Sequence, residues 1–450
     1  MTLQDEALTY LLNFVCGLEN VSTDMKGTVS QTSLKVGYTA DPDRIEQYDI
    51  VFVPSGFFAS DAYGKKESLP TSPLPKIEGI PFLFGSDLIE KKGSTIVIHA
   101  DLPASAFCFL SRYEELCHPE LRDEHGRFNA RWSLLTKNGF LAKPLVDAYT
   151  AFIRKLLQET GRQMPTNQGK LSKLWLTHDV DVPFYCQGFR SFAREALKGS
   201  GLKKALRLAL QKAEADPYYT FRYFFDTDSR AISLCTFPVE GIYFFKAGGN
   251  SIHDKPVYSL ESKRMRHLLY AVQNEGFQIG LHGSYSSGKT GKISKEKKLL
   301  EKAIKENIYS FRQHFLRACE PSCFTQLENS GITDDFTMGY ADMAGFRLGT
   351  CRPVRWINPS SGHLTSLLLH PLAIMDTTLF QTSYMGLSFD KAKDYCLQLV
   401  EQARLHDGEL CLLWHNSNIS VQACPGNQRP WIRDLYTFII DHLCDIDPRN

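Results

Sequence analysis

Apolar and polar residues follow one another in a repeating order along the last two thirds of the chain. Short apolar runs, typical of buried strands, alternate with stretches whose apolar residues have helical spacing. Strands are predicted at residues 174–182, 241–245, 277–282, 309–316, 367–374 and 410–414, and helices at 189–215, 260–274, 295–305, 390–406 and 431–443. This alternation predicts a parallel sheet, and seven or eight such units favour closure into an α/β barrel of the (β/α) kind.

The first third of the chain has its own pattern and predicts a smaller α/β domain. Helices are predicted at residues 6–18, 101–115 and 144–159, and strands at 50–53 and 95–98. Asp101 is expected to cap its helix, with Pro103 in the first turn. The polar stretch 161–173 contains one proline and two glycines, a composition that indicates a linker. We therefore predict an N-terminal domain at residues 1–165 and a barrel at 172–450.

Charge and cysteine content narrow the classes of protein. The 51 basic and 50 acidic residues leave a net charge of +1, so no overall field attracts nucleic acid or an anionic membrane surface. No apolar run approaches the roughly 18 residues that a membrane span needs, and the first residues lack the pattern of a secretory signal. Twelve cysteines without a Cys-x-x-Cys pair are then expected to be reduced, in a cytoplasmic protein.

Several predicted strands end in side chains that carry chemistry. Asp179 and Asp181 are two residues apart at the end of the strand that begins at residue 174, so they point the same way if the strand continues through them. His282, His415 and the pair Arg312 and His314 stand at or near the ends of three other strands. Because a parallel barrel gathers these ends on one rim, we expect the residues to meet there.

These segments resemble motifs of the polysaccharide deacetylase superfamily, carbohydrate esterase family 4. The matching segments are Thr177-His-Asp-Val-Asp181, His282-Gly-Ser-Tyr-Ser286, Arg312 and Leu413-Trp-His415. The resemblance implies a distorted (β/α) barrel of about seven strands. It also implies a metal-dependent hydrolase that removes N- or O-linked acetyl groups from a carbohydrate or glycan precursor.

More closely, the chain resembles a divergent bacterial branch with a His-Asp-Val-Asp first motif. Shared features are the Arg-x-His strand, a Gly-Phe-Arg-x-Gly-Thr segment (Gly345 to Thr350) and a Trp-His-Asn ending. That branch often carries an N-terminal domain of unknown function with two signatures. They match Ser-Arg-Tyr-Glu-Glu at residues 111–115 and Asp-x-His-Gly-Arg-Phe at 123–128.

The resemblance implies a role for each rim residue. Asp179 would be the general base, Arg312 would hold its carboxylate, and His415 would protonate the leaving group. A divalent ion, zinc in the first place, would lower the pKa of a bound water and polarise the acetyl carbonyl. Substrate binding is assigned to Tyr285, Arg347, Trp414 and Asn416, of which the two aromatic residues would stack on a sugar.

The metal ligands depart from the family pattern. Ser286 stands where the family has its second metal histidine, and Val180 where it has a second contiguous aspartate. Since Arg312 and His314 leave the same face of a strand, His314 is a replacement ligand. We therefore hypothesise that Asp181, His282 and His314 hold the metal, while Asp179 and Asp181 could exchange roles.

Two other functions remain open from the residues alone. One is a metal-free, non-catalytic carbohydrate-binding protein of the same fold. The other is a P-loop NTPase, because Gly283 to Thr290 match Gly-x-x-x-x-Gly-Lys-Thr after a strand. Against the NTPase, Gly291 follows at once and Ser294 is the better helix cap, so the helix would begin too late to bind phosphate.

Overall fold

The structure is a computed structural model that describes residues 3–18, 34–185, 213–318, 322–420 and 431–444. Its contacts divide the chain into two compact units. The first comprises Met1–Lys170, Gly345–Pro371 and Glu401–Gly408, and the second Leu171–Ala344, Leu372–Val400 and Glu409–Asn450. Two later segments thus belong with the N-terminal part, and the boundaries 1–165 and 172–450 stay a prediction. Most of the helix predicted at 189–215 lies outside the described residues.

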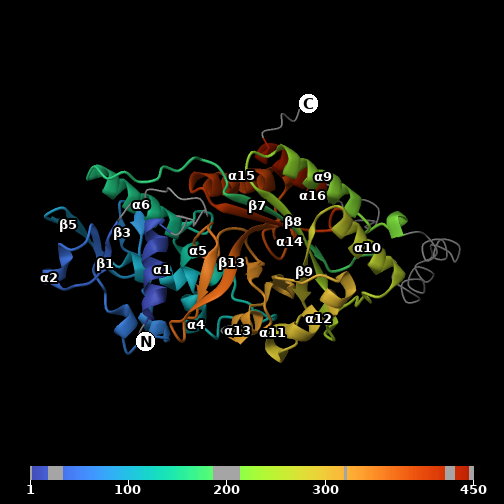
Figure 1. The fold of residues 1–450 in the computed structure, drawn as a ribbon, viewed down its shortest axis with the longest axis horizontal. Coiled ribbons are helices and arrows are strands. Elements are labelled where there is room, and N and C mark those ends of the chain that lie inside the picture. The colour runs from blue at the N-terminus through green and yellow to red at the C-terminus, as the bar shows by residue number, and fades with distance from the viewer. Residues whose placement is uncertain (1–2, 19–33, 186–212, 319–321, 421–430, 445–450) are drawn as a thin grey trace. The chain divides into compact units, whose positions relative to one another are not determined.

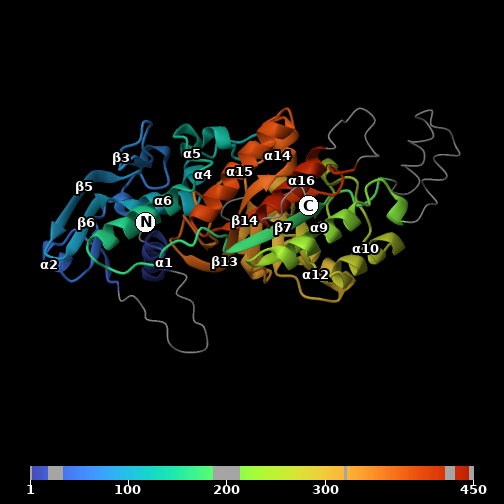
Figure 2. The ribbon, with the colours of Figure 1, turned by 90° about the horizontal axis from the view of Figure 1, so that it is seen from above.

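The first unit contains a four-stranded sheet in the order β1-β2-β6-β5, in which the first three strands are parallel and β5 is antiparallel. The paired strands β5 and β6 are labelled side by side in Figure 2. Its strands are β1 (Val36–Tyr38), β2 (Ile50–Phe52), β5 (Gly85–Lys92) and β6 (Thr95–Ala100), with β3 (Lys76–Ile77) and β4 (Ile80–Pro81) in a separate ribbon. Its helices are α1 (Asp5–Cys16), α2 (Pro42–Ile45), α3 (Leu102–Leu110), α4 (Tyr113–Cys117), α5 (Leu134–Lys137) and α6 (Leu145–Glu159).

The predicted N-cap of the helix expected at residues 101–115 is confirmed, but the helix is shorter than expected. The Asp101 carboxylate accepts a hydrogen bond of 3.1 Å from the backbone N–H of Ala104, three residues into α3. Arg112 has φ 61°, in the left-handed region, and therefore separates α3 from α4. The predicted single helix over 101–115 is thus two helices.

The second unit is a closed barrel, as predicted. Six strands, in the order β11-β10-β9-β8-β7-β14, continue into β13, and β11 also pairs with β13, which closes the ring of seven. They are β7 (Lys173–Val180), β8 (Val239–Lys246), β9 (Gln278–Gly283), β10 (Ser310–Gln313), β11 (Asp334–Met338), β13 (Leu364–Met375) and β14 (Glu409–His415). Only the part of β13 from Leu372 onward belongs to this unit, while the earlier part pairs antiparallel with β12 (Val354–Ile357).

Helices lie outside the barrel strands, with α9, α10, α12 and α16 along β7, β8 and β9 (Figure 1). The helices of this part are α9 (Phe221–Leu234), α10 (Lys263–Asn274), α11 (Ser287–Thr290), α12 (Ile293–Ile304), α13 (Ser322–Asn329), α14 (Asp376–Phe380), α15 (Phe389–Leu405, whose residues from Glu401 belong to the first unit) and α16 (Trp431–Leu443). Side chains of alternate strand residues, among them Trp175, Phe244, Phe336 and Leu413, fill the barrel as one buried cluster. The polar residues at the strand ends form the next layer, nearer the carboxyl ends of the strands.

The strand register explains why the polar residues meet. Asp179 of β7 is level with Phe244 of β8 on one side and with His415 of β14 on the other. Lys246 of β8 is level with His282 of β9, which is level in turn with Arg312 of β10. Because all these strands are parallel, their carboxyl ends form one rim.

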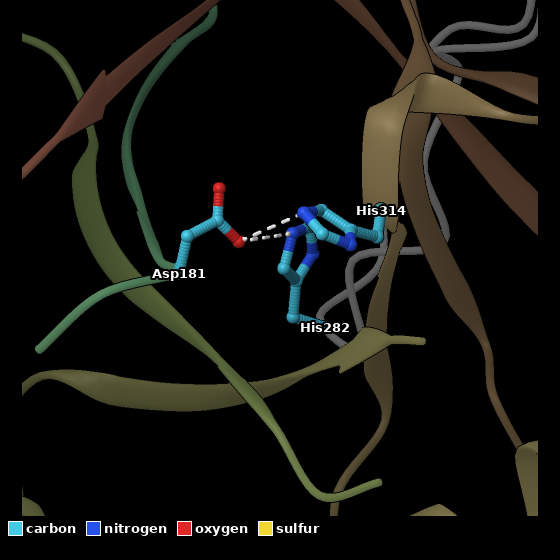
Figure 3. Close-up of side chains that lie close together, drawn as sticks. All are labelled: Asp181, His282 and His314. Carbon is cyan, nitrogen blue, oxygen red and sulfur yellow. Dashed lines mark ion pairs between the residues drawn. The ribbon is translucent and has the colours of Figure 1, made fainter. Parts of the chain in front are cut away.

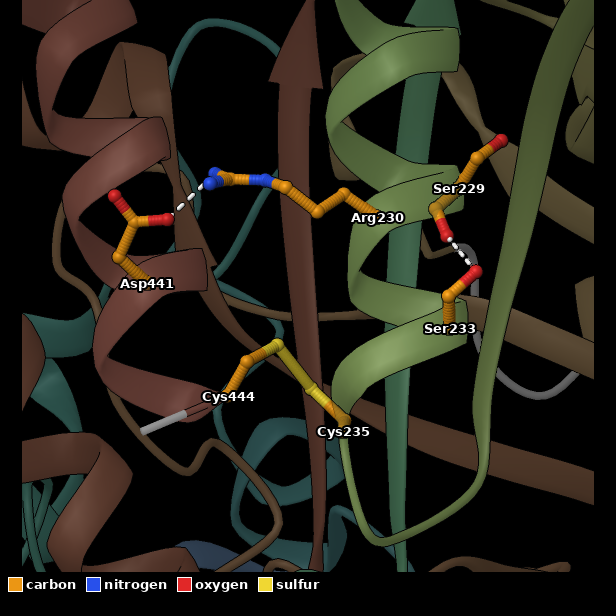
Figure 4. The surroundings of a disulfide bond; sticks show 6 residues. All are labelled: Ser229, Arg230, Ser233, Cys235, Asp441 and Cys444. Carbon is orange, nitrogen blue, oxygen red and sulfur yellow. Dashed lines mark hydrogen bonds and ion pairs between the residues drawn. A yellow bond between two sulfur atoms is a disulfide. The ribbon is translucent and has the colours of Figure 1, made fainter. Parts of the chain in front are cut away.

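The expectation that every cysteine is reduced is wrong for two of them. Cys235 follows α9, Cys444 follows α16, and the two form a disulfide across a sequence separation of 209 residues (Figure 4). Arg230 of α9 also forms an ion pair with Asp441 of α16. Nothing in the local sequence marks the two cysteines as partners, since only the tertiary packing of these two helices brings them together.

We expect Cys235→Ser to lower the free energy of unfolding by about 2–4 kcal/mol under oxidising conditions, because the cross-link closes a long loop. Urea unfolding with and without dithiothreitol measures this. Reductant should bring the wild type to the stability of the variant and leave the variant unchanged. A wild-type midpoint that does not respond to reductant would contradict the prediction.

Candidate metal and catalytic site

The three proposed metal ligands converge at the rim of the barrel (Figure 3). Oδ1 of Asp181 lies 3.2 Å from Nε2 of His282 and 3.2 Å from Nε2 of His314. One ligand atom from each residue lies within 4.8 Å of the other two, a spacing that can hold a metal ion. Both histidines are buried, whereas a quarter of the Asp181 side chain is exposed.

The second ring nitrogen of each histidine is fixed by a neighbour. Nδ1 of His282 lies 3.0 Å from the backbone oxygen of Arg312, and since a carbonyl can only accept, Nδ1 must carry the proton. Nδ1 of His314 lies 3.3 Å from Oδ1 of Asp254, a buried carboxylate. Such partners orient metal-binding imidazoles and turn the lone pair of Nε2 toward the ion.

Two atoms at this point lack a hydrogen-bond partner within the described residues. Within the described residues, Oδ1 of Asp181 and Nε2 of His282 are buried and make no hydrogen bond, although they lie close to each other. Leaving buried polar atoms unsatisfied is costly, and a cation bound by both would remove that cost. The donor set of one carboxylate and two imidazoles suits Zn²⁺, which takes nitrogen and oxygen ligands.

The charges around the rim also favour a cation. Four carboxylates face two fixed cations, so when His314 is neutral, as a metal ligand must be, negative charge is in excess even if His415 is protonated. The carboxylates belong to Asp179, Asp181, Asp254 and Asp376, and the cations are Arg312 and Lys246. A bound divalent ion would offset this excess.

His314 reaches the site from a turn rather than from a strand. The predicted strand over 309–316 is too long, because β10 ends at Gln313 and His314–Leu316 form a 3-10 turn. Phe315 and Leu316 have φ values of 62° and 52°, a left-handed conformation that is strained for bulky residues. This strained turn follows His314 directly, and the Phe315 ring packs against the imidazole at 4.8 Å between centroids.

Asp179 is held by Arg312, as the motif resemblance implies. Nη1 of Arg312 donates to Oδ1 of Asp179 at 2.9 Å, and its Nε donates to the backbone oxygen of Phe336. Burial alone would raise the pKa of Asp179, but the nearby His282 and Arg312 outweigh it and lower the pKa. Oδ2 of Asp179 lies 3.6 Å from Nε2 of His282, whereas Asp181 is closer and touches both histidines. The geometry therefore favours Asp181 as ligand and Asp179 as base.

His415 stands on the other side of Asp181, with Nε2 3.7 Å from Oδ2 of that residue. Its Nδ1 lies 2.7 Å from Oδ1 of Asp376, and its backbone N–H donates to Oδ2 of Asp376. Burial lowers the pKa of His415, but the Asp376 carboxylate more than offsets this and raises it to about 9. His415 is therefore protonated at neutral pH, as a general acid must be.

Three supporting residues were not among the candidates for the hydrolase site. Asp376 ends the apolar run of β13 and Lys246 ends the run of β8, so both carried the signal that marked the other rim residues. Asp254, which contacts His314, lies in a loop turn and carried no such signal.

Two predicted sugar-binding residues have structural roles instead. Trp414 is fully buried, its Nε1 donates to the backbone oxygen of Ile432, and its ring packs on Tyr436, so it cannot stack on a sugar. Strand alternation explains this, because Trp414 points away from the barrel interior that His415 faces. Asn416 is buried too, and its amide donates to backbone oxygens of Val182 and Tyr218.

Arg347 is likewise accounted for by protein contacts. It belongs to the first unit, where its guanidinium makes a two-point ion pair with Glu115 at 3.0 and 2.8 Å. Arg112 also pairs with Glu115. Burial would raise the pKa of Glu115, but the two arginines lower it to about 2. The Ser-Arg-Tyr-Glu-Glu and Gly-Phe-Arg segments thus meet in one buried ion-pair cluster, and the assignment of Arg347 to substrate is wrong.

Tyr285 is the one predicted sugar-binding residue that stays partly exposed. Its ring packs against those of His253 and Phe315, and the Arg317 guanidinium lies 3.9 Å from its centroid. Contact with a sugar remains a prediction for this residue.

The segment from Gly283 to Thr290 does not have the geometry of a phosphate loop. Its helix α11 is only four residues long and ends at Gly291 (φ 66°), and α12 begins at Ile293, with Lys292 rather than Ser294 at its cap. The backbone N–H of Ser284 donates to the carboxylate of Glu296, and that of Tyr285 to Asp254. Carboxylates therefore occupy positions where a phosphate would have to bind.

We expect Lys289→Ala to leave any hydrolytic activity within about threefold of the wild type, because the segment from Gly283 to Thr290 lacks the geometry of a phosphate loop. Rates with a sugar substrate and ATP binding by calorimetry measure this. Tight ATP binding by the wild type that the variant loses would instead support the NTPase.

Comparisons with known proteins bear on both parts of the chain. Residues 2–162 match a family of unknown function, DUF7033, in agreement with the expected N-terminal domain. No curated protein matches the chain. Within the described residues, no helix is both long and apolar enough to cross a membrane.

Three solved structures are similar to the chain. A protein described as a polysaccharide deacetylase, from Mycobacterium smegmatis, is 15% identical with a TM-score of 0.40, over 63% of this chain and 89% of that one. Another so described, from Pseudomonas aeruginosa PAO1, is 11% identical with a TM-score of 0.36 over the same shares. The Puue allantoinase is 10% identical with a TM-score of 0.36, over 62% of this chain and 89% of that one.

Proposed function

We propose that the protein is a metal-dependent hydrolase that removes acetyl groups, bound through nitrogen or oxygen, from a carbohydrate or glycan precursor. The observation that carries the proposal is the arrangement around Asp181. A two-histidine, one-carboxylate cluster has an ionised carboxylate, Asp179, on one side and a protonated imidazole, His415, on the other. Base, ligands and acid are the parts that hydrolysis of an acyl group requires.

Asp181, His282 and His314 would hold the ion, zinc in the first place, which when bound lowers the pKa of a water and polarises a carbonyl. Asp179 takes a proton at its carboxylate, and Arg312 keeps that carboxylate oriented and ionised. His415 donates the proton on Nε2 to the departing amine or alcohol, while Asp376 holds Nδ1. The motif resemblance, rather than the geometry, supports an acetylated sugar as the substrate.

Elemental analysis of the purified protein, combined with acetate release from a panel of N- and O-acetylated sugars, tests the proposal. We expect about one divalent ion per chain, acetate release that a chelator abolishes, and recovery when Zn²⁺ is restored. Asp181→Asn should lose both the ion and the activity, whereas Asp390→Asn, at an exposed position in α15, should lose neither. Sugar binding without an ion and without acetate release would favour the non-catalytic binding protein.

A further inference from the structure

Lys246 is a buried lysine at the centre of the rim that the proposed mechanism does not use. It is the last residue of β8, level with His282, and only 4% of it is exposed. Its backbone N–H donates to the hydroxyl of Tyr258 at 2.7 Å, and that hydroxyl donates to the backbone oxygen of Val180 at 2.9 Å. Tyr258 thereby ties the ends of β7 and β8 together, so Lys246 is held beside Asp181.

The ammonium group of Lys246 can donate more hydrogen bonds than it makes within the described residues. An ammonium has three hydrogen-bond donors, and among the described residues Nζ makes one hydrogen bond, of 3.0 Å, to the backbone oxygen of Asp254. Nζ also lies 4.0 Å from Oδ1 of Asp181. That oxygen is the one that both histidines face, and therefore the one that would bind the ion.

We propose that Lys246 competes with the divalent ion for Oδ1 of Asp181 and so sets how tightly the site holds metal; this inference rests on the proposed metal site. One carboxylate oxygen serves two cations, the lysine when the ion is absent and the ion when it is bound. Two positive groups this close repel each other, and burial reduces the screening between them. Lys246 thus weakens the site and keeps its ion exchangeable.

Lys246→Gln tests this, because glutamine can still donate to the Asp254 carbonyl but carries no charge. Each protein is stripped with a chelator and titrated with Zn²⁺ by calorimetry, with a competing chelator present. We expect Lys246→Gln to bind Zn²⁺ about tenfold more tightly than the wild type, or tighter still. Lys263→Met, which removes an exposed positive charge at the start of α10, should bind as the wild type does.

Lys246→Met is the second variant, and thermal unfolding of the stripped proteins checks that each is folded. Equal or weaker Zn²⁺ binding by a folded Lys246 variant would overturn the inference, since Lys246 would then support the site instead of competing for it. Absence of Zn²⁺ binding in every protein, the wild type included, would also overturn it. Tighter binding in the variants without acetate release by the wild type would leave the inference standing and refute only the proposed hydrolase.

Discussion

Asp179→Asn is expected to reduce acetate release by about 10²–10⁴-fold while Zn²⁺ binding stays within a few-fold of the wild type. The substitution keeps the volume of the side chain but removes the group that accepts a proton. The ion should remain, because Asp181 lies at 3.2 Å from both histidines whereas Asp179 approaches only His282, at 3.6 Å. Steady-state kinetics and calorimetry on the same protein samples measure the two effects.

Asp181→Asn is the matched comparison for this variant, since it makes the same chemical change two residues away. It should lose the ion first and activity as a consequence, and excess Zn²⁺ should restore part of the rate. If the two variants behave the other way round, Asp179 is the ligand and Asp181 the base. A wild-type rate in metal-loaded Asp179→Asn would remove Asp179 from the mechanism.

The rim could be predicted from the sequence because it depends on two local rules. Apolar runs mark the buried strands, and in a parallel barrel every strand delivers its last residues to the same edge. His282 and His415 were found in this way, and their placement needed no knowledge of individual contacts. Applied to every strand, the same rules also select Lys246 and Asp376, which lie at the ends of β8 and β13. Neither residue lies in a segment that matches the resembled family, so the motifs did not assign them to the site.

Alternation within a strand could also have corrected the sugar-binding residues. His415 is level with Asp179 and faces the rim, so its neighbour Trp414, level with His178, must face the surrounding helices. The structure places Trp414 against Tyr436 of α16 for this reason. A conspicuous aromatic residue beside a catalytic one is therefore poor evidence for a sugar-stacking platform.

Contacts between distant segments could not be predicted from the sequence. Glu115 and Arg347 are separated by 232 positions, and the disulfide partners by 209. Charge or a thiol group on each partner is visible, but the choice of partner depends on how complete elements pack. The turn after β10 belongs to the same class, because Phe315 favours a strand by propensity, whereas tertiary contacts hold Phe315 and Leu316 in a left-handed conformation.

Arg312→Met is expected to lower the free energy of unfolding of the metal-free protein by about 3–5 kcal/mol. Arg312 is fully buried, and it pairs with Asp179 at 2.9 Å while its guanidinium lies 4.5 Å from the centroid of the Phe244 ring. Methionine fills much of the space but leaves the Asp179 carboxylate buried without its cation. Most of the loss in the free energy of unfolding should come from this buried, unpaired carboxylate rather than from packing.

A double-mutant cycle separates the effect of the unpaired carboxylate from that of the packing. The Asp179→Asn protein has no carboxylate at this position. In that background, Arg312→Met should cost about 1–3 kcal/mol less stability than it does in the wild type. Urea unfolding in the presence of a chelator gives the four free energies without a contribution from metal binding. Additive losses would show that Arg312 stabilises the barrel through Phe336 and Phe244 alone. It would then have no part in keeping Asp179 ionised.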